Sequence, residues 1–227
     1  MLNWARRWTS QSVVWPEIDY ELIDLKERGL MRGLVLNAGC GWRNISHLVE
    51  GTLINQDITW PNDSRTNVDI FSPLHDIPRP TGTFDAIICI AVLEHVENPE
   101  EITSEMFRVL KHGGHLIASV PFLQPEHKIP TDFQRYTRDG LVSLMSRHGF
   151  IVKEIKPLFS IYHTLHWIVY ECLHLKNGFA NKILRVLLLP PLALLARDSD
   201  LVSDTVATAF RVIAQKPGTP LGSDEPE

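Results

Sequence analysis

The chain has 227 residues, of which 44% are hydrophobic and 22% are charged, as is ordinary for a soluble protein with one well-buried domain. Its formal net charge of −5 gives no support for a nucleic-acid partner. The three cysteines show no paired spacing and the first residues lack an apolar core, so neither a disulfide framework nor a secretory signal is expected. A cytoplasmic location is therefore favoured.

Strand and helix patterns alternate along the chain. Apolar runs of strand length predict strands at 34–37, 52–58, 67–71, 84–90, 115–120, 150–155 and 205–215. Helical spacing or capping signals predict helices at 16–30, 44–50, 98–110, 137–147 and 159–197. The expected fold class is α/β, an open doubly wound sheet with helices on both faces. A Trp-rich arm over residues 1–15 precedes the sheet and is expected either to pack over the domain or to form a lid over a substrate cleft.

The first strand runs into Gly39-Cys40-Gly41, which would bring bare backbone close to a ligand at the carboxyl end of a sheet. A dinucleotide-binding turn would need a third glycine where Asn44 stands, so a pyrophosphate ligand is disfavoured. The turn suits instead a nucleoside with a charged, extended tail. Asp57 ends the second strand and could bind ribose hydroxyls, and Asp69 near the third strand could lie beside an adenine.

Four stretches, VLNAGCG (35–41), FDAII (84–88), AVLEHV (91–96) and LKHGG (110–114), resemble successive motifs of class I S-adenosylmethionine-dependent methyltransferases, the type 11 group. The resemblance implies a Rossmann-like, seven-stranded, mostly parallel sheet with an antiparallel last strand, and S-adenosyl-L-methionine as the cofactor. It implies methyl transfer to an oxygen or nitrogen of a small-molecule, sugar or lipid-linked acceptor. The implied cofactor-binding residues are Asn37, Ala38, Gly39, Cys40, Gly41, Asp57, Ile58, Asp69, Ile70, Ile90, Ala91 and Val92.

Three positions depart from the family pattern. Asn37 stands where an acid is usual, Arg43 replaces a glycine, and Pro73 takes the place of an acid that contacts adenine in many relatives. These departures keep a second hypothesis open, a non-catalytic module that binds the cofactor or a partner. A dinucleotide oxidoreductase is the third and least favoured hypothesis.

The candidate catalytic residues are two histidines. His95 follows the fourth strand and could be a general base or a structural cap, and His127 lies in the loop after the fifth strand. That loop also carries Asp132, Arg135 and Tyr136, which either contact the substrate or tie the loop down through a salt bridge. No metal is expected, because no second ligand pair lies at zinc spacing.

The most apolar segment, 183–196, is too short to span a bilayer of ~30 Å, and Pro190-Pro191 should break any helix there. It could pack on the sheet, form a homodimer contact, or touch a membrane or a lipid-linked acceptor. We expect a single domain over 1–215, with an N-terminal arm and helix (1–32), a cofactor core (33–157), a helical insertion (158–203) and the last strand (204–215). A disordered tail would follow over 216–227.

Overall fold

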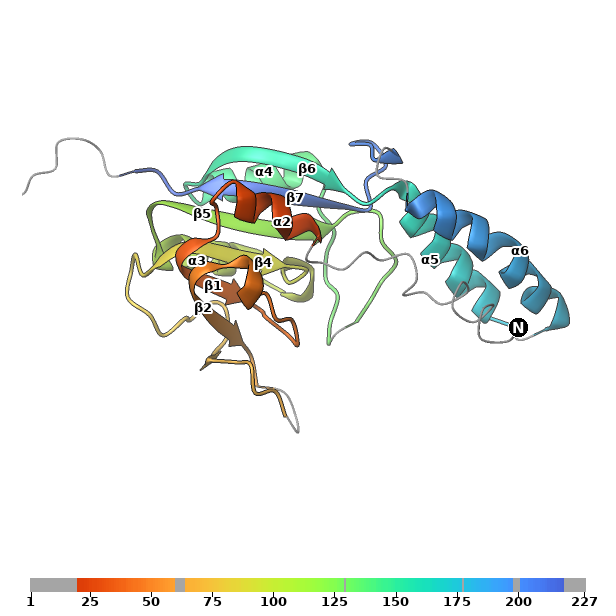
Figure 1. The fold of residues 1–227 in the computed structure, drawn as a ribbon, viewed down its shortest axis with the longest axis horizontal. Coiled ribbons are helices and arrows are strands. Elements are labelled where there is room, and N and C mark those ends of the chain that lie inside the picture. The colour runs from red at the N-terminus through yellow and green to blue at the C-terminus, as the bar shows by residue number, and fades with distance from the viewer. Residues whose placement is uncertain (1–19, 60–63, 129, 177, 198–200, 219–227) are drawn as a thin grey trace, which may run out of the picture.

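The computed structural model describes residues 20–59, 64–128, 130–176, 178–197 and 201–218. The expected N-terminal arm and most of the C-terminal tail lie outside these residues. The elements, in chain order, are shown in Figure 1.

Seven strands form one sheet in the order β3-β2-β1-β4-β5-β7-β6. The strands are β1 (Arg32–Ala38), β2 (Glu50–Asp57), β3 (Ile70–Phe71), β4 (Phe84–Ile90), β5 (Leu110–Pro121), β6 (Ile151–Leu158) and β7 (Ala209–Gln215). Neighbours from β3 to β5 pair in parallel, whereas β7 pairs antiparallel with both β5 and β6. The predicted α/β sheet with an antiparallel last strand is confirmed.

Helices cover both faces of the sheet (Figure 1). The first half of the chain supplies α2 (Tyr20–Glu27), α3 (Pro99–Val109) and the 3-10 turns η2 (Ser46–Leu48) and η3 (Leu93–His95), and α4 (Arg138–Arg147) follows β5. Adjacent strand residues point to opposite faces, so Val35 packs with Leu22 and Leu25 of α2, and Leu36 joins the core that holds Met106 of α3 and Leu144 of α4. The sheet is thus doubly wound.

Arg211 of β7 ties α2 to the far edge of the sheet. Its guanidinium, 4% exposed, lies 2.8 Å from Asp24 of α2 and 3.2 Å from Glu154 of β6. Burial alone raises the pKa of each carboxyl, but hydrogen bonds and charges from the neighbouring arginines outweigh it and lower both pKa values.

Three local predictions are wrong. The helix expected at 44–50 is only the turn η2, because β2 already begins at Glu50. Gly113-Gly114 does not separate α3 from a later strand, since β5 begins at Leu110 and passes through both glycines. Their backbone bonds to Lys216, which is buried, so the predicted disordered tail does not begin at 216.

The predicted helical insertion is a hairpin of α5 (Ile161–His174) and α6 (Phe179–Ala196) that extends beyond the sheet (Figure 1). Contrary to prediction, α6 continues through Pro190-Pro191, with Leu189 and Ala193 fully buried on either side of them. Packing outweighs the local preference there. The helix has 18 residues, about 27 Å at 1.5 Å per residue, and is long and apolar enough to cross a membrane by length and composition. Only 17% of it is buried.

Candidate functional site

A cavity of about 800 Å³ opens at the carboxyl ends of β1, β2 and β4. This is the edge of a doubly wound sheet at which ligands bind. Ten of the residues predicted from sequence line it: Gly39, Cys40, Gly41, Asp57, Ile58, Ile90, Ala91, Val92, His95 and His127.

The turn after β1 forms one wall of the cavity. Gly39 and Gly41 have φ angles of +65° and +55°, in the left-handed region that glycine adopts without strain. Their amides donate to side chains of β2, Gly39 to Gln56 at 3.1 Å and Gly41 to Asp57 at 2.7 Å. A β-carbon on Gly39 would lie 2.6 Å from Val92, whereas one on Gly41 would meet nothing within 4 Å. The Gly41 backbone is therefore bare towards open space.

Asp57 is nearly buried and already well bonded. Its Oδ2 lies 2.6 Å from Arg65, whose side chain is 1% exposed, and its Oδ1 accepts the amide of Ile58 at 2.7 Å. Together with Gly41, three donors engage a carboxylate that has about four acceptor positions. Two further residues stabilise this wall and are not evident from the sequence: Gln56, which lines the cavity and accepts the Gly39 amide, and Arg65, which donates to Asp57.

Four predicted cofactor residues do not line the cavity. Asn37 and Ala38 are buried in β1, and the Asn37 amide donates to Asn55 at 2.9 Å. Asp69 precedes β3 rather than ending it, and its carboxylate accepts the backbone amide of Asn55 at 2.8 Å. Ile70 is buried in β3. The proposed contact of Asp69 with an adenine has no support from this geometry.

Pro73, Leu74 and His75 form the cavity wall beyond β3. An acid was expected near here in the family pattern, and this wall offers an apolar surface and an imidazole in its place. His75 was not singled out from the sequence.

Ala91 follows β4 with a φ of +54°, one of two non-glycine residues with positive φ among the described residues. Its amide donates to the Ser119 carbonyl of β5 at 2.9 Å. A strained backbone of this kind persists only where its surroundings hold it, and such residues cluster at functional sites. Ala91 and Val92 thus lie on the cavity at a fixed, energetically costly turn.

The far end of the cavity is formed by η3 and the loop after β5. His95 Nδ1 bonds to the carbonyl of Thr131, and His127 Nδ1 lies 3.1 Å from the carbonyl of Pro125. The two rings meet edge to face, with centroids 5.2 Å apart. The Nε2 atoms of His95 and His127 lie 3.8 and 3.7 Å from the same carboxylate oxygen, Oε1 of Glu94.

Glu94 is buried beneath this end, with 1% of its side chain exposed. Neither carboxylate oxygen has a hydrogen-bond partner among the described residues. The pKa of His127 is raised, because the interaction with Glu94 outweighs the effect of burial, which alone would lower the pKa. Glu94 was part of a family motif in the sequence but was not recognised as a site residue.

The three predicted substrate residues lie behind His127 rather than on the cavity. Asp132 accepts the backbone amide of His127 at 2.7 Å and is held by Arg135, which also donates to the Pro125 carbonyl at 2.8 Å. The hydrogen bond from Arg135 holds the pKa of Asp132 well below its usual range. Tyr136 is buried in the core. The salt-bridge interpretation fits this geometry, and the loop thereby positions His127.

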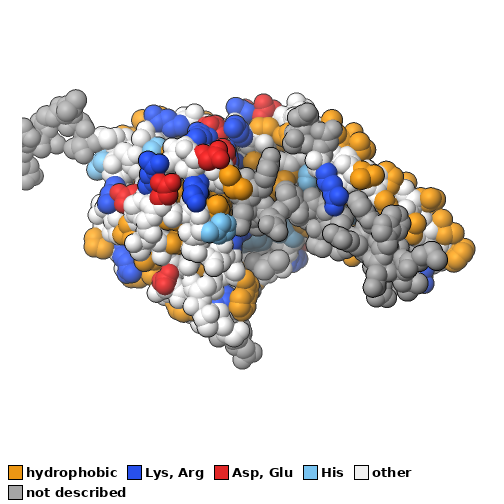
Figure 2. All heavy atoms as spheres, in the orientation of Figure 1, with side chains coloured by type: hydrophobic (Ala, Val, Ile, Leu, Met, Phe, Trp, Pro, Cys, Tyr) orange, Lys and Arg blue, Asp and Glu red, His pale blue; other side chains and the backbone are white. Residues whose placement is uncertain are grey.

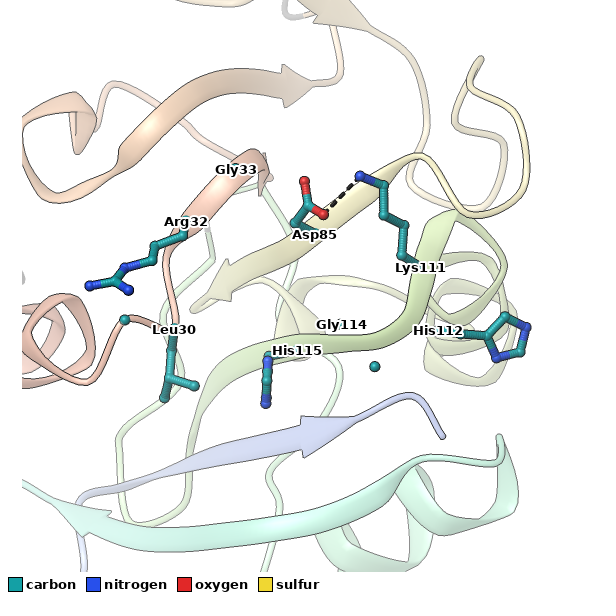
Figure 3. Close-up of a pocket in the computed structure, with 10 residues that line it drawn as sticks. Leu30, Arg32, Gly33, Asp85, Lys111, His112, Gly114 and His115 are labelled. Carbon is teal, nitrogen blue, oxygen red and sulfur yellow. Dashed lines mark hydrogen bonds and ion pairs between the residues drawn. The ribbon is translucent and has the colours of Figure 1, made fainter. Parts of the chain in front are cut away.

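A second cavity, of about 430 Å³, lies at the amino ends of β1, β4 and β5 (Figure 3). Asp85 is its acidic residue, and the two carboxylate oxygens accept from Lys111 at 2.7 Å and from the Leu34 amide at 2.8 Å. These bonds connect the beginnings of β1, β4 and β5. The cavity is on the edge of the sheet opposite to the glycine turn and the two histidines.

Comparisons with known proteins agree with this architecture. A family model described as a methyltransferase domain, of type 11, matches residues 36–118. A probable S-adenosylmethionine-dependent methyltransferase of Mycolicibacterium smegmatis is 27% identical, over 55% of this chain and 54% of the relative. The chain thus spans about half the length of this curated relative.

Solved structures share the fold at low identity. The [4+2]-cyclase SpnF has a TM-score of 0.59 at 18% identity, covering 88% of this chain and 81% of that one. A putative methyltransferase from Bacillus halodurans has a TM-score of 0.56 at 15% identity, covering 86% and 98%. Residues 36–118 thus match the type 11 methyltransferase domain, and the similar curated protein is a probable S-adenosylmethionine-dependent methyltransferase.

Proposed function

We propose that this protein transfers a methyl group from S-adenosyl-L-methionine to an oxygen or nitrogen atom of an acceptor. One observation carries the proposal: a single cavity at a type 11 domain is lined both by the glycine turn and by His95 and His127. The bare backbone of Gly41 and the carboxylate of Asp57 suit a cationic nucleoside without phosphates.

The residues that would hold the cofactor follow from their places in the cavity. Gly39 and Gly41 would lie against its methionine portion, and Ile90 to Val92 against the adenine or the sulfonium. Asp57 would accept from the ribose. Since three donors already engage its carboxylate, about one acceptor position remains, and we expect one ribose hydroxyl there rather than two.

When bound, the cofactor supplies an electrophilic methyl group on a positively charged sulfur. The protein then has mainly to place the acceptor in line and to exclude water. His95 and His127 lie at the end of the cavity where the acceptor would enter, and both are fixed by backbone carbonyls. We propose that these two residues act on the acceptor's O–H or N–H group.

The α5–α6 hairpin favours an apolar or lipid-linked acceptor, and with it a peripheral membrane contact. Hydrophobic side chains gather over the hairpin (Figure 2), and Leu187 and Leu194 are 60% and 59% exposed. The hairpin is continuous with the acceptor end, because Trp167 of α5 lies 5.5 Å from the His127 ring, between centroids. A lipid-linked substrate could thus pass from a membrane surface along α5 to the cavity.

Calorimetry with S-adenosylmethionine and S-adenosylhomocysteine tests the proposal directly. We expect binding of both, and methyl transfer to one or more members of an acceptor panel that includes lipid-linked sugars. No heat and no thermal shift with either nucleoside would refute it. Binding without turnover would favour the alternative, a non-catalytic module, which the departures at Asn37, Arg43 and Pro73 keep open.

A further inference from the structure

Three side chains able to bind a metal converge at the acceptor end of the cavity. Glu94 and His95 come from η3, and His127 comes from the loop after β5, 32 residues after His95 in the sequence. One ligand atom from each lies within 4.8 Å of the others. Two imidazoles and one carboxylate, with room for an added ligand, form a common set for a divalent transition-metal ion.

The orientation of the imidazoles points to a cation between them and Glu94. A carbonyl can only accept a hydrogen bond, so the contacts to Thr131 and Pro125 place a proton on Nδ1 of His95 and His127. The Arg135 guanidinium also approaches His127 Nδ1, but at 3.4 Å it is farther away than the Pro125 carbonyl at 3.1 Å. In the neutral rings, each Nε2 then presents a lone pair. Both lone pairs face Oε1 of Glu94, at 3.8 and 3.7 Å, and acceptor facing acceptor is repulsive unless a proton or a metal cation lies between them. Metal-binding histidines are typically held through their other nitrogen in this way.

The state of Glu94 leads to the same conclusion independently. Only 1% of its side chain is exposed to solvent, yet its carboxylate accepts no hydrogen bond from a described residue. A buried charge without a partner is costly, and proteins pair such groups or use them to bind metals. The nearby guanidinium of Arg135 is engaged by Asp132 and by the carbonyl of Pro125.

We propose that Glu94, His95 and His127 bind a divalent transition-metal ion of the Zn²⁺ type. The two histidines line the cavity, so an open coordination position would face the acceptor. The ion would lower the pKa of an oxygen acceptor bound there. The O–H proton would pass to water, the oxygen's electron pair would form the bond to the methyl carbon, and the carbon–sulfur pair would remain on the sulfur of the departing S-adenosylhomocysteine. This catalytic role rests on the proposed function, whereas metal binding itself does not.

The test uses the full chain freed of metal with a chelator. Zn²⁺ is titrated calorimetrically, and Co²⁺ is titrated by its visible absorption, which reports nitrogen ligands. We expect the unchanged protein to bind one ion, and Glu94→Gln and His127→Ala to bind it at least about tenfold more weakly. His112→Ala is the matched control, because His112 Nδ1 is also held by a carbonyl, that of Pro217 at 2.9 Å, but lies far from Glu94 at the second cavity.

Thermal unfolding of each metal-free variant shows whether it folds, and Glu94→Gln should fold at least as well because it removes a buried, unpaired charge. Equal affinity in all variants would mean that the ion binds elsewhere and would overturn the proposal. The absence of binding to the folded, unchanged protein would overturn it as well. Binding of S-adenosylhomocysteine by the same metal-free sample separates this failure from failure of the proposed methyltransferase function.

Discussion

Replacing Gly41 by alanine tests whether its bare backbone serves the cofactor or only the turn. Gly41 has a φ of +55°, and an added β-carbon would meet no protein atom within 4 Å. Gly82 is the matched control, since its φ is +69° and its surroundings are equally open, but it lies away from the cavity.

The expected cost in stability is the same at both sites. Alanine in the left-handed region costs roughly 1–2 kcal/mol, and no steric term is added at either position. Gly39→Ala should cost more, because its β-carbon would lie 2.6 Å from Val92 and overpacking adds about 1–3 kcal/mol. Urea unfolding of the three variants gives these differences.

The Gly41→Ala and Gly82→Ala variants, although equal in expected stability, should differ in their affinity for the cofactor. Gly41→Ala should weaken S-adenosylhomocysteine binding well beyond its loss of stability, because a methyl group would occupy the space meant for the ligand. Gly82→Ala should bind normally in calorimetry. If Gly41→Ala binds as tightly as the unchanged protein, the ligand does not approach this backbone and the assignment of the turn is wrong.

The remaining predictions concern stability and membrane contact. Asp24 and Glu154 have lowered pKa values, so their stabilising effect is present above the ordinary values of 3.8 and 4.5 and is lost as the pH falls through the lower values in the folded protein. Unfolding free energies of the unchanged protein and Arg211→Met should therefore converge as the pH drops below 4.5, and a gap that stays constant would contradict the network. Thr137→Ala removes the hydroxyl that accepts the first-turn amide of α4 at 3.1 Å, and should cost about 1 kcal/mol in urea unfolding. Leu187→Asp, at a position 60% exposed on α6, should reduce co-sedimentation with anionic liposomes without lowering the melting temperature; equal sedimentation would argue against a membrane contact through α6.

Sequence patterns predicted best those elements whose own residues determine them. β4 was predicted with its observed bounds, Phe84–Ile90, because a continuous apolar run between two turns suits a strand buried on both faces. Thr137 was predicted as the cap of α4, and Pro99 does begin α3. Asn98 precedes that helix as expected, although its side chain makes no capping hydrogen bond.

The wrong predictions arose where tertiary contacts outweigh local preference. The sequence predicts that Gly114 ends a helix, but it lies within β5. There the Asp85 carbonyl oxygen packs so close that a β-carbon on residue 114 would lie only 2.8 Å from it, so the position requires glycine. Pro190-Pro191 should break α6, yet the buried Leu189 and Ala193 hold the helix to its packing surface. Neither contact can be inferred from spacing along the chain.

The proposed metal set could not be found from sequence spacing. The sequence predicts no metal because no second ligand pair lies at zinc spacing, whereas Glu94, His95 and His127 come together only in the folded protein. Glu94 is adjacent to His95 in the sequence, but its proposed role depends on its burial and on the approach of His127 Nε2 from the loop after β5. A charged residue within an otherwise apolar motif was the available signal, because a buried carboxylate is rare unless it is paired.

The two ends of the cavity therefore differ in what family membership can tell about them. The glycine turn and the end of β4 lie within the matched residues 36–118, so the family match supports their proposed relation to the cofactor. His127 and the α5–α6 hairpin lie beyond residue 118, and Glu94 and His95 gain their chemistry only by meeting His127. SpnF, described as a [4+2]-cyclase, shares the fold, so the fold alone does not determine the reaction. On the proposed function, the residues at the acceptor end would determine the reaction, and a metal ion between Glu94 and the two imidazoles would select an oxygen acceptor over a protonated amine.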